Sequence, residues 1–154
     1  MITYIRHFQD EDFSRLLEID QECFEPGIAY DAASLRYFLY YIESHAVVLV
    51  SNSAVVGFGI ASSSRTGRGK LLGHIIALDL DSRVRGQGHG KALLRHLEQI
   101  LSDDGAAEVT LEVDIRNTAA IGFYLRMGYK KVRELRHYYG EGRSAYQMVR
   151  PLLE

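Results

Sequence analysis

The sequence predicts a mixed α/β fold in which one sheet of six to seven strands, mostly antiparallel, is flanked by about four helices. Three observations lead to this class. Segments with the apolar pattern of a strand alternate with segments whose apolar residues have helical spacing. Residues 71–113 have the pattern of a strand, a glycine turn, a helix and a second strand. A hairpin pattern precedes this unit and another follows it. A helix between two strands favours a parallel pair, so we expect one such pair within the sheet.

Length and composition fit a single domain over residues 1–154. The chain has 47% hydrophobic and 25% charged residues, which is enough for one core and ordinary for a soluble globular protein. No apolar run reaches the roughly 20 residues of a membrane span, and the amino terminus has no signal-peptide pattern. We expect a cytoplasmic protein without a membrane partner.

Charge and metal-ligand content exclude several classes of partner. The formal net charge is −2 with a pI near 6.3, which argues against general nucleic-acid binding. The single cysteine, Cys23, excludes an internal disulfide and suits a reducing compartment. Its place in an apolar helical pattern predicts a core thiol rather than a nucleophile. The six histidines lack ligand spacing, so no metal site is expected.

The first elements in chain order are a strand and two helices. Ile2 to His7 alternates as a strand, and residues 13–24 carry apolar side chains at helical spacing. Pro26-Gly27 ends this helix, and a second begins near Asp31. Tyr30 lies on the intervening loop, where its amphipathic ring is a candidate for a binding wall.

A hairpin and a long strand follow. Residues 46–50 and 55–61 are β-branched and apolar and predict a hairpin. Residues 62–70, rich in serine and glycine, predict a surface loop. Leu71 to Asp81 then reads as a strand whose continuous apolar part is buried on both faces.

A glycine turn joins this strand to the next helix. It comprises Arg85, Gly86, Gln87, Gly88, His89, Gly90 and Lys91. Glycines at alternate positions leave backbone N–H groups unobstructed, and the following helix aims its positive dipole end at the same point. The turn therefore predicts an anion site, most simply for phosphate, although a tight strand-to-helix turn without a ligand is the alternative.

Two common phosphate motifs do not fit this turn. A P-loop requires a first glycine where Arg85 stands and a serine or threonine where Ala92 stands. The dinucleotide fingerprint requires a third glycine at Lys91.

The strand after the helix has one polar face. Residues 90–101 form the helix, and in the strand Val109 to Val113 the side chains of Thr110, Glu112 and Asp114 share a face. Parallel strands are normally apolar on both faces. Either this strand lies at an edge of the sheet or Glu112 points into a cleft.

The last elements are a capped helix and a hairpin. Asn117 caps a helix over residues 119–127, which Gly128 stops. Residues 129–139 and 143–150 pair through Gly140-Glu141-Gly142 as a final hairpin.

Three separated motifs resemble the GCN5-related N-acetyltransferases. The family's cofactor motif, Gln/Arg-x-x-Gly-x-Gly/Ala, matches Arg85 to Gly90 in full. The downstream residues resemble the ribosomal-protein N-terminal alanine acetyltransferase branch. They are Leu111-Glu112-Val113, Asn117, Ala119, Ala120, Ile121, Tyr124, Gly128-Tyr129 and Arg136-x-Tyr138-Tyr139. The resemblance covers residues 72–152 well and implies a fold in which the central parallel pair splays apart.

The resemblance implies acetyl-CoA as the acetyl donor, without a metal. The amides of residues 86–90 would hold the pyrophosphate, and Arg85 and Lys91 would add charge. The pantetheine arm would pair with the backbone of Leu78, Asp79 and Leu80, and the N–H of Leu80 would stabilise the oxyanion. Asn117 would hydrogen-bond the pantetheine, although a helix cap is expected there without any ligand.

The resemblance also implies the catalytic roles. Glu112 would accept a proton from the attacking amine, directly or through water, and Tyr124 would protonate the departing CoA thiolate. Tyr138 and Tyr139 would flank the acceptor together with Tyr30. The expected acceptor is the N-terminal α-amine of a protein or peptide. A lysine side chain or a small polyamine, and a CoA-binding sensor without turnover, are the alternatives.

Overall fold

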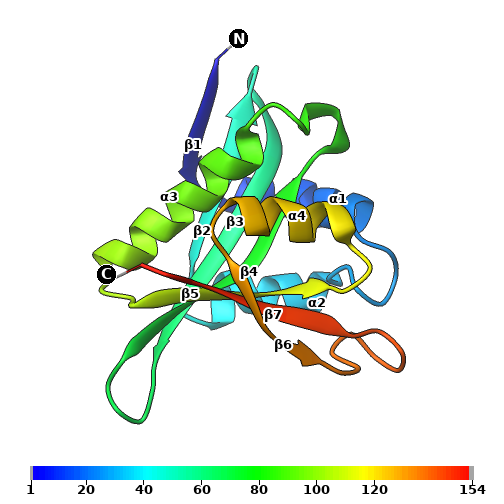
Figure 1. The fold of residues 1–154 in the computed structure, drawn as a ribbon. Helices are drawn as coiled ribbons and strands as arrows, with labels where there is room; N and C mark the ends of the chain where they lie inside the picture. Colours follow the sequence, from blue (N-terminus) through cyan, green and yellow to red (C-terminus); the bar gives the residue numbers. More distant parts are fainter. Residues whose placement is uncertain (1, 153–154) are drawn as a thin grey trace. The chain divides into compact units, whose positions relative to one another are not determined.

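A computed structural model describes residues 2–152 and contains seven strands and four α-helices (Figure 1). The strands are β1 Thr3–His7, β2 His45–Ser51, β3 Ala54–Arg65, β4 Leu71–Leu80, β5 Glu108–Asp114, β6 Lys130–Leu135 and β7 Ala145–Pro151. The helices are α1 Phe13–Cys23, α2 Ala32–Arg36, α3 His89–Asp103 and α4 Thr118–Arg126. Short helical turns are η1 Asp10–Asp12, the π-type η2 Tyr37–Tyr41 and η3 Ser82–Val84.

The strands hydrogen-bond in the order β1-β2-β3-β4-β5-β7-β6. The pairs β1–β2, β2–β3, β5–β7 and β6–β7 are antiparallel. In contrast, β4 and β5 run parallel, with Leu72 opposite Glu108 and His74 opposite Thr110. The predicted mixed sheet with one parallel pair and about four helices is therefore confirmed.

The described chain falls into two compact units. The first comprises residues 2–62 and 75–100, and the second comprises residues 63–74 and 101–152. Because the chain passes from one unit to the other within β4, the two ends of this strand belong to different units.

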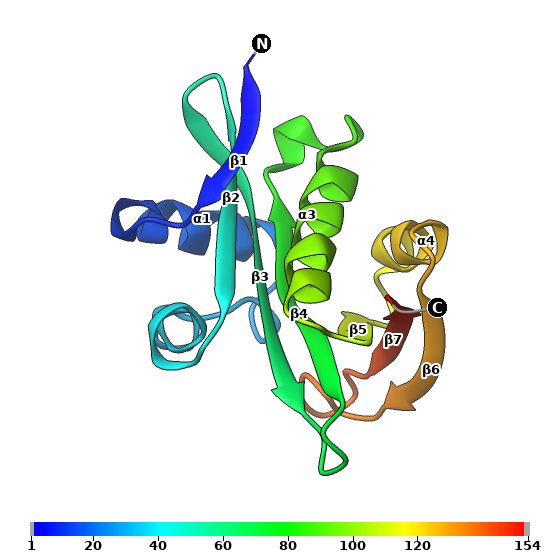
Figure 2. The same cartoon turned by 90° about the vertical axis from the view of Figure 1, so that its left-hand side faces the viewer.

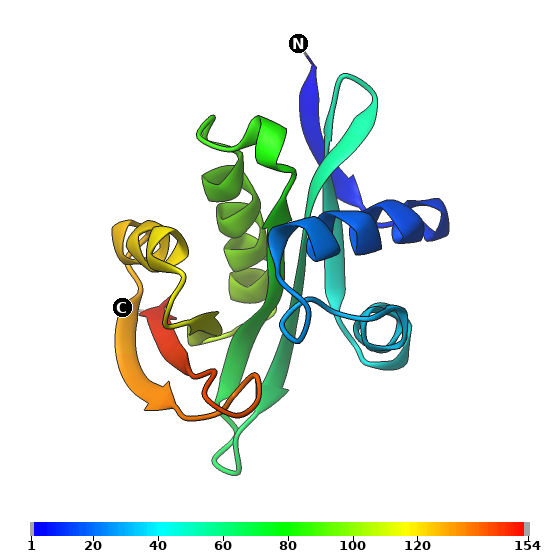
Figure 3. The ribbon, with the colours of Figure 1, turned by 90° about the vertical axis from the view of Figure 1, so that its right-hand side faces the viewer.

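The first unit buries its apolar side chains on both faces of β2 and β3. Helix α3 covers one face, and α1 and α2 cover the other (Figures 2 and 3). Close approach of α3 depends on Gly59, where an added Cβ would lie 2.5 Å from a methyl group of Leu97. The core on the α1 and α2 side comprises Leu16, Ile19, Leu35, Val48, Val50, Phe58, Ile60 and Ala77.

The second unit packs α4 over the antiparallel strands β5 and β7 (Figure 1). Ile121 of α4 and Tyr129 just after it are buried, as are Leu111 of β5 and Met148 of β7. Gly128 ends α4 with a φ of +96°, a left-handed conformation that glycine adopts without strain.

Two local predictions differ from the structure. Strand β3 continues to Arg65 into the predicted loop, because its last residues are polar and exposed and so lack an apolar strand pattern. The final hairpin has a longer connection than Gly140 to Gly142, since β6 ends at Leu135 and β7 begins at Ala145. A 3-10 turn precedes the first helix, where the carboxylate of Asp12 accepts the N–H of Gln9. Within residues 2–152, no helix is long and apolar enough to span a bilayer.

Candidate functional site

The glycine turn follows β4 in the first unit and leads into α3. Gly86 and Gly88 have φ values of +76° and +83°, which disfavour any side chain. A Cβ at either position would meet no atom within 4 Å, so the glycines are required by the backbone conformation and not by packing. The turn is exposed, and its N–H groups stand at the amino end of a 15-residue helix.

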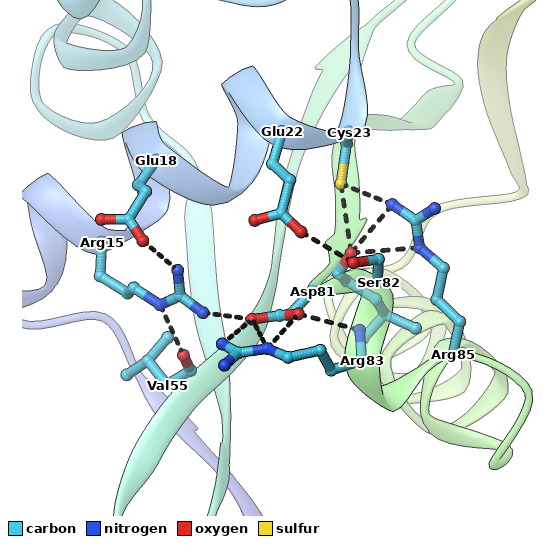
Figure 4. Close-up of polar contacts among 10 residues, drawn as sticks. Arg15, Glu18, Glu22, Cys23, Val55, Asp81, Ser82, Arg83 and Arg85 are labelled. Carbon is cyan, nitrogen blue, oxygen red and sulfur yellow. Dashed lines mark hydrogen bonds and ion pairs between the residues drawn. The ribbon is translucent and has the colours of Figure 1, made fainter.

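A buried carboxylate anchors the segment between β4 and this turn. Asp81 is 1% exposed, accepts the backbone N–H of Arg83, and binds the guanidinium groups of Arg83 and Arg15 (Figure 4). The hydrogen bonds from Arg83 are the main reason that the pKa of Asp81 lies well below its usual range. Because Arg15 belongs to α1 and also donates to Val55 of β3, the route into the glycine turn is tied to two other elements.

Asp79, predicted to bind the cofactor, has its side chain buried against a second carboxyl. Asp79 and Asp20 are 2% and 1% exposed, and no N–H or O–H donor among the described residues reaches either oxygen of Asp79. Desolvation first, and the Asp20 carboxyl second, raise the pKa of Asp79 well above its usual range. The raised pKa favours a protonated Asp79 beside the Asp20 carboxyl, and the buried side chain leaves only the Asp79 backbone for a ligand.

This acid pair predicts an unusual pH dependence of stability. The pKa of Asp79 is higher in the folded chain than in the unfolded chain. The contribution of Asp79 to the free energy of unfolding is therefore fully present below about pH 4, and it is lost as the pH rises through the raised pKa. The loss is about 1.4 kcal/mol per pH unit within that window. We expect Asp79→Asn to remove this dependence, since an amide does not titrate. Urea unfolding at pH 5 and pH 8 measures it, and Glu141→Gln is the control. The same pH dependence of stability in the wild type and in Asp79→Asn would contradict a raised pKa of Asp79.

Tyr30, predicted to line the acceptor wall, lies against β4. Its hydroxyl donates to the carbonyl of Ile76 at 2.9 Å, and its ring packs on Phe38 with 5.1 Å between centroids. Its backbone N–H donates to Asp20 at 2.6 Å. Tyr30 therefore holds the loop between α1 and α2 on the core of the first unit.

In the second unit, two side chains converge on Glu112. His74 Nε2 lies 2.6 Å from Glu112 Oε1, and the Tyr138 hydroxyl donates to the same oxygen at 3.2 Å. A carboxylate only accepts, so a hydrogen bond to an ionised Glu112 requires the form of His74 that has a hydrogen on Nε2. The Glu112 side chain is 12% exposed and the His74 side chain is 37% exposed, so the cluster is accessible from one side. Glu112 is therefore not a solvated edge carboxylate, because β7 pairs with β5 along its whole length.

Tyr138 and Tyr139 form an edge-to-face pair with 4.9 Å between ring centroids. Burial, followed by the charge of Glu112, raises the pKa of Tyr138 to about 12. Burial raises the pKa of Tyr139 as well. Both hydroxyls remain protonated at neutral pH, and Tyr138 acts as a donor to the Glu112 carboxylate.

Tyr124 and Asn117 lie on α4 and at its start. Asn117 is the N-cap, as predicted, and its side-chain oxygen accepts the N–H of Ala120 at 3.1 Å. The ring of Tyr124 contacts those of Phe123 and Tyr129 in T-shaped geometry, at 5.2 and 5.8 Å. Tyr124 is half-buried, so its aromatic body belongs to the core of the second unit.

His74 was missed by the sequence interpretation. The signal was present, because His74 is a polar residue within a mostly apolar strand that runs parallel to β5. The register that places His74 opposite Thr110 also puts it diagonal to Glu112, since residues two apart share a face. This register cannot be derived from either strand alone.

Comparison with known proteins adds three findings. The acetyltransferase (GNAT) family model matches residues 13–129. An N-alpha-acetyltransferase of Sulfurisphaera tokodaii is 40% identical over 52% of this chain and 48% of its own length, so the match spans about half of that protein. N-alpha-acetyltransferase 30 of Schizosaccharomyces pombe is 28% identical over 97% of both chains.

The fold also matches solved structures. The ribosomal-protein-S18-alanine N-acetyltransferase from Escherichia coli superimposes with a TM-score of 0.81 and 23% identity, covering 99% of this chain and 96% of that one. At this identity the likeness concerns the fold.

Proposed function

Because the chain belongs to the acetyltransferase (GNAT) family, as its motifs suggested, we propose that it is a cytoplasmic enzyme that transfers acetyl from acetyl-CoA to the N-terminal α-amine of a protein or peptide. The observation that carries this proposal is the cluster of His74 and Tyr138 on Glu112. A carboxylate held by two donors on one oxygen is suited to accept a proton with the other. We further propose that residues 1–154 act as one acetyltransferase domain.

The first unit supplies the groups that bind acetyl-CoA in this proposal. The exposed turn Gly86 to Gly90 offers backbone N–H groups and a helix amino end to the pyrophosphate, and the exposed Lys91 adds charge. The backbone of Leu78, Asp79 and Leu80 pairs with the pantetheine amides. The N–H of Leu80 donates to the thioester carbonyl oxygen, which becomes an oxyanion when the amine attacks.

The second unit supplies the proton transfers. The amine attacks the thioester carbon, and the proton that it loses passes to Glu112 directly or through water, while His74 and Tyr138 hold the carboxylate in place. Collapse of the tetrahedral intermediate breaks the C–S bond, and Tyr124 donates its proton to the CoA thiolate. The products are the acetylated amine and CoA, with no covalent enzyme intermediate.

Two arguments support the N-terminal α-amine as the acceptor: the names of the relatives and the fraction of the amine that is unprotonated at pH 7. Relatives that match most of this chain are named N-alpha-acetyltransferases. An α-amine with a pKa near 8 is unprotonated in roughly one molecule in ten at pH 7, whereas a lysine amine is unprotonated in about one in two thousand. Tyr30, Tyr138 and Tyr139 are proposed to flank this acceptor.

Release of CoA thiol with a panel of amines tests the proposal. We expect turnover with peptides that have a free N-terminus and none with the same peptides blocked by N-terminal acetylation. Lysine peptides with a blocked N-terminus and polyamines complete the panel, and turnover confined to them would reassign the acceptor. Thermal stabilisation by acetyl-CoA without thiol release from any amine would indicate a sensor instead.

A further inference from the structure

Three hydrogen-bond donors converge on the backbone carbonyl oxygen of Leu80, the last residue of β4. Arg85 donates through Nη2 at 3.1 Å and Nε at 3.3 Å, and the thiol of Cys23 donates at 3.2 Å. Nη2 of Arg85 also lies 3.1 Å from the sulfur of Cys23 (Figure 4). Since β4 ends here, this carbonyl is satisfied by side chains from α1 and from the glycine turn.

The opposite side of the same peptide group is held as well. The N–H of Asp81 donates to the carbonyl of Val56 at 2.7 Å. The peptide between Leu80 and Asp81 is planar, so fixing its carbonyl and its N–H fixes its orientation. The carboxylate of Asp81 is anchored in turn by Arg15 and Arg83.

The thiol of Cys23 acts here as a donor. Burial is the largest cause that raises the pKa of Cys23 to about 11, so the sulfur keeps its proton at neutral pH. This agrees with the interpretation of Cys23 as a packed thiol and not a nucleophile. Cys23 is the last residue of α1, so the contact connects α1 with the end of β4.

The Arg85 side chain has partners within the protein that a counter-charge for phosphate does not require. Its guanidinium is directed at a neutral carbonyl and a neutral thiol. The motif position that Arg85 occupies takes glutamine or arginine, which share a planar group with N–H donors but not a charge. Lysine has the positive charge but lacks a planar group with N–H donors in one plane.

We propose that Arg85 is a positioning residue that orients the end of β4 for the acetyl group. This rests on the proposed function, in which the N–H of Leu80 stabilises the oxyanion. The N–H of Leu80 lies in the preceding peptide group, which meets the anchored one at the Leu80 Cα. By holding the carbonyl of Leu80, Arg85 fixes one of the two peptide groups at this residue and so limits the directions that its N–H can take. Cys23 supports the same carbonyl from α1.

The test compares Arg85→Gln with Arg85→Lys. Glutamine keeps a planar group with N–H donors and loses the charge, whereas lysine keeps the charge and N–H donors but loses the planar group. We expect Arg85→Gln to keep kcat within about threefold of the wild type and Arg85→Lys to lose about 10- to 100-fold, since one oxyanion donor is worth up to about 10²–10³ in kcat. The dissociation constant of CoA should change by less than about threefold in both, because uncharged backbone groups hold the pyrophosphate.

Lys91→Gln shows the effect of removing a side chain that is proposed to bind the pyrophosphate through its charge, and it is compared with the two Arg85 variants. It should weaken CoA binding and reduce the salt dependence of binding. Arg68→Gln, on an exposed loop, controls for net charge. Melting temperatures of all variants establish that they are folded, and the two long replacements at Arg85 leave no large cavity.

The opposite ranking would overturn the inference. If Arg85→Lys turns over like the wild type while Arg85→Gln weakens CoA binding and flattens its salt dependence, Arg85 is a phosphate counter-charge. Failure of the proposed function looks different, because the wild type itself would then transfer no acetyl group to any amine.

Discussion

Glu112→Gln is expected to lower kcat for acetyl transfer at pH 7 by about 10²–10³, the range typical of a lost general base. An amide cannot accept the proton of the attacking amine. Its carbonyl oxygen nevertheless keeps the contacts with His74 and Tyr138, so the cluster stays assembled. Single-turnover acetylation of an N-terminal peptide measures the chemical step, and calorimetric titration shows that the acetyl-CoA affinity is intact.

Glu108→Gln is the matched control for this result. Glu108 lies on the same strand and the same face as Glu112, and it pairs with Lys70. Its replacement should leave kcat within about twofold of the wild type, as exposed ion pairs contribute little. Unchanged turnover in Glu112→Gln would remove Glu112 as the base and would point to His74.

Gly88→Val is expected to raise the dissociation constant of acetyl-CoA by about 10- to 100-fold. Gly88 has a φ of +83°, and a β-branched residue held there stores roughly 1–3 kcal/mol of strain. The turn relieves this strain by moving its backbone, which turns N–H groups away from the pyrophosphate. Thermal shift across a range of acetyl-CoA concentrations measures the change in affinity.

Gly69→Val is the control that distinguishes a specific loss of acetyl-CoA affinity from the general effect of backbone strain. Gly69 has a φ of +81°, and a Cβ there also meets no atom within 4 Å. This variant should lose similar stability and keep the acetyl-CoA affinity of the wild type, because Gly69 lies on the connection between β3 and β4. Equal losses of affinity at Gly88 and Gly69 would exclude the glycine turn as the pyrophosphate site.

Local patterns were sufficient for the outline of the fold and for part of the site. The glycine turn, the Asn117 cap and the polar face that carries Glu112 each depend on residues within a few positions of one another. Backbone conformation, capping and strand periodicity act over that range, so they can be predicted from one stretch of sequence. The boundary errors in β3 and the final hairpin arose where strands are polar and exposed.

The hydrogen bonds and packing contacts around the candidate site residues join positions that are far apart in the sequence. His74 reaches Glu112 only through the register of the parallel strands, 38 residues apart. Cys23 and Arg85 meet at Leu80, and Asp20 meets Asp79, because α1 packs beside the end of β4. The sequence by itself determined which local element each predicted site residue occupies. The tertiary structure decided which side chains lie next to one another or contact the same backbone carbonyl, because burial and long-range packing set the distances between them.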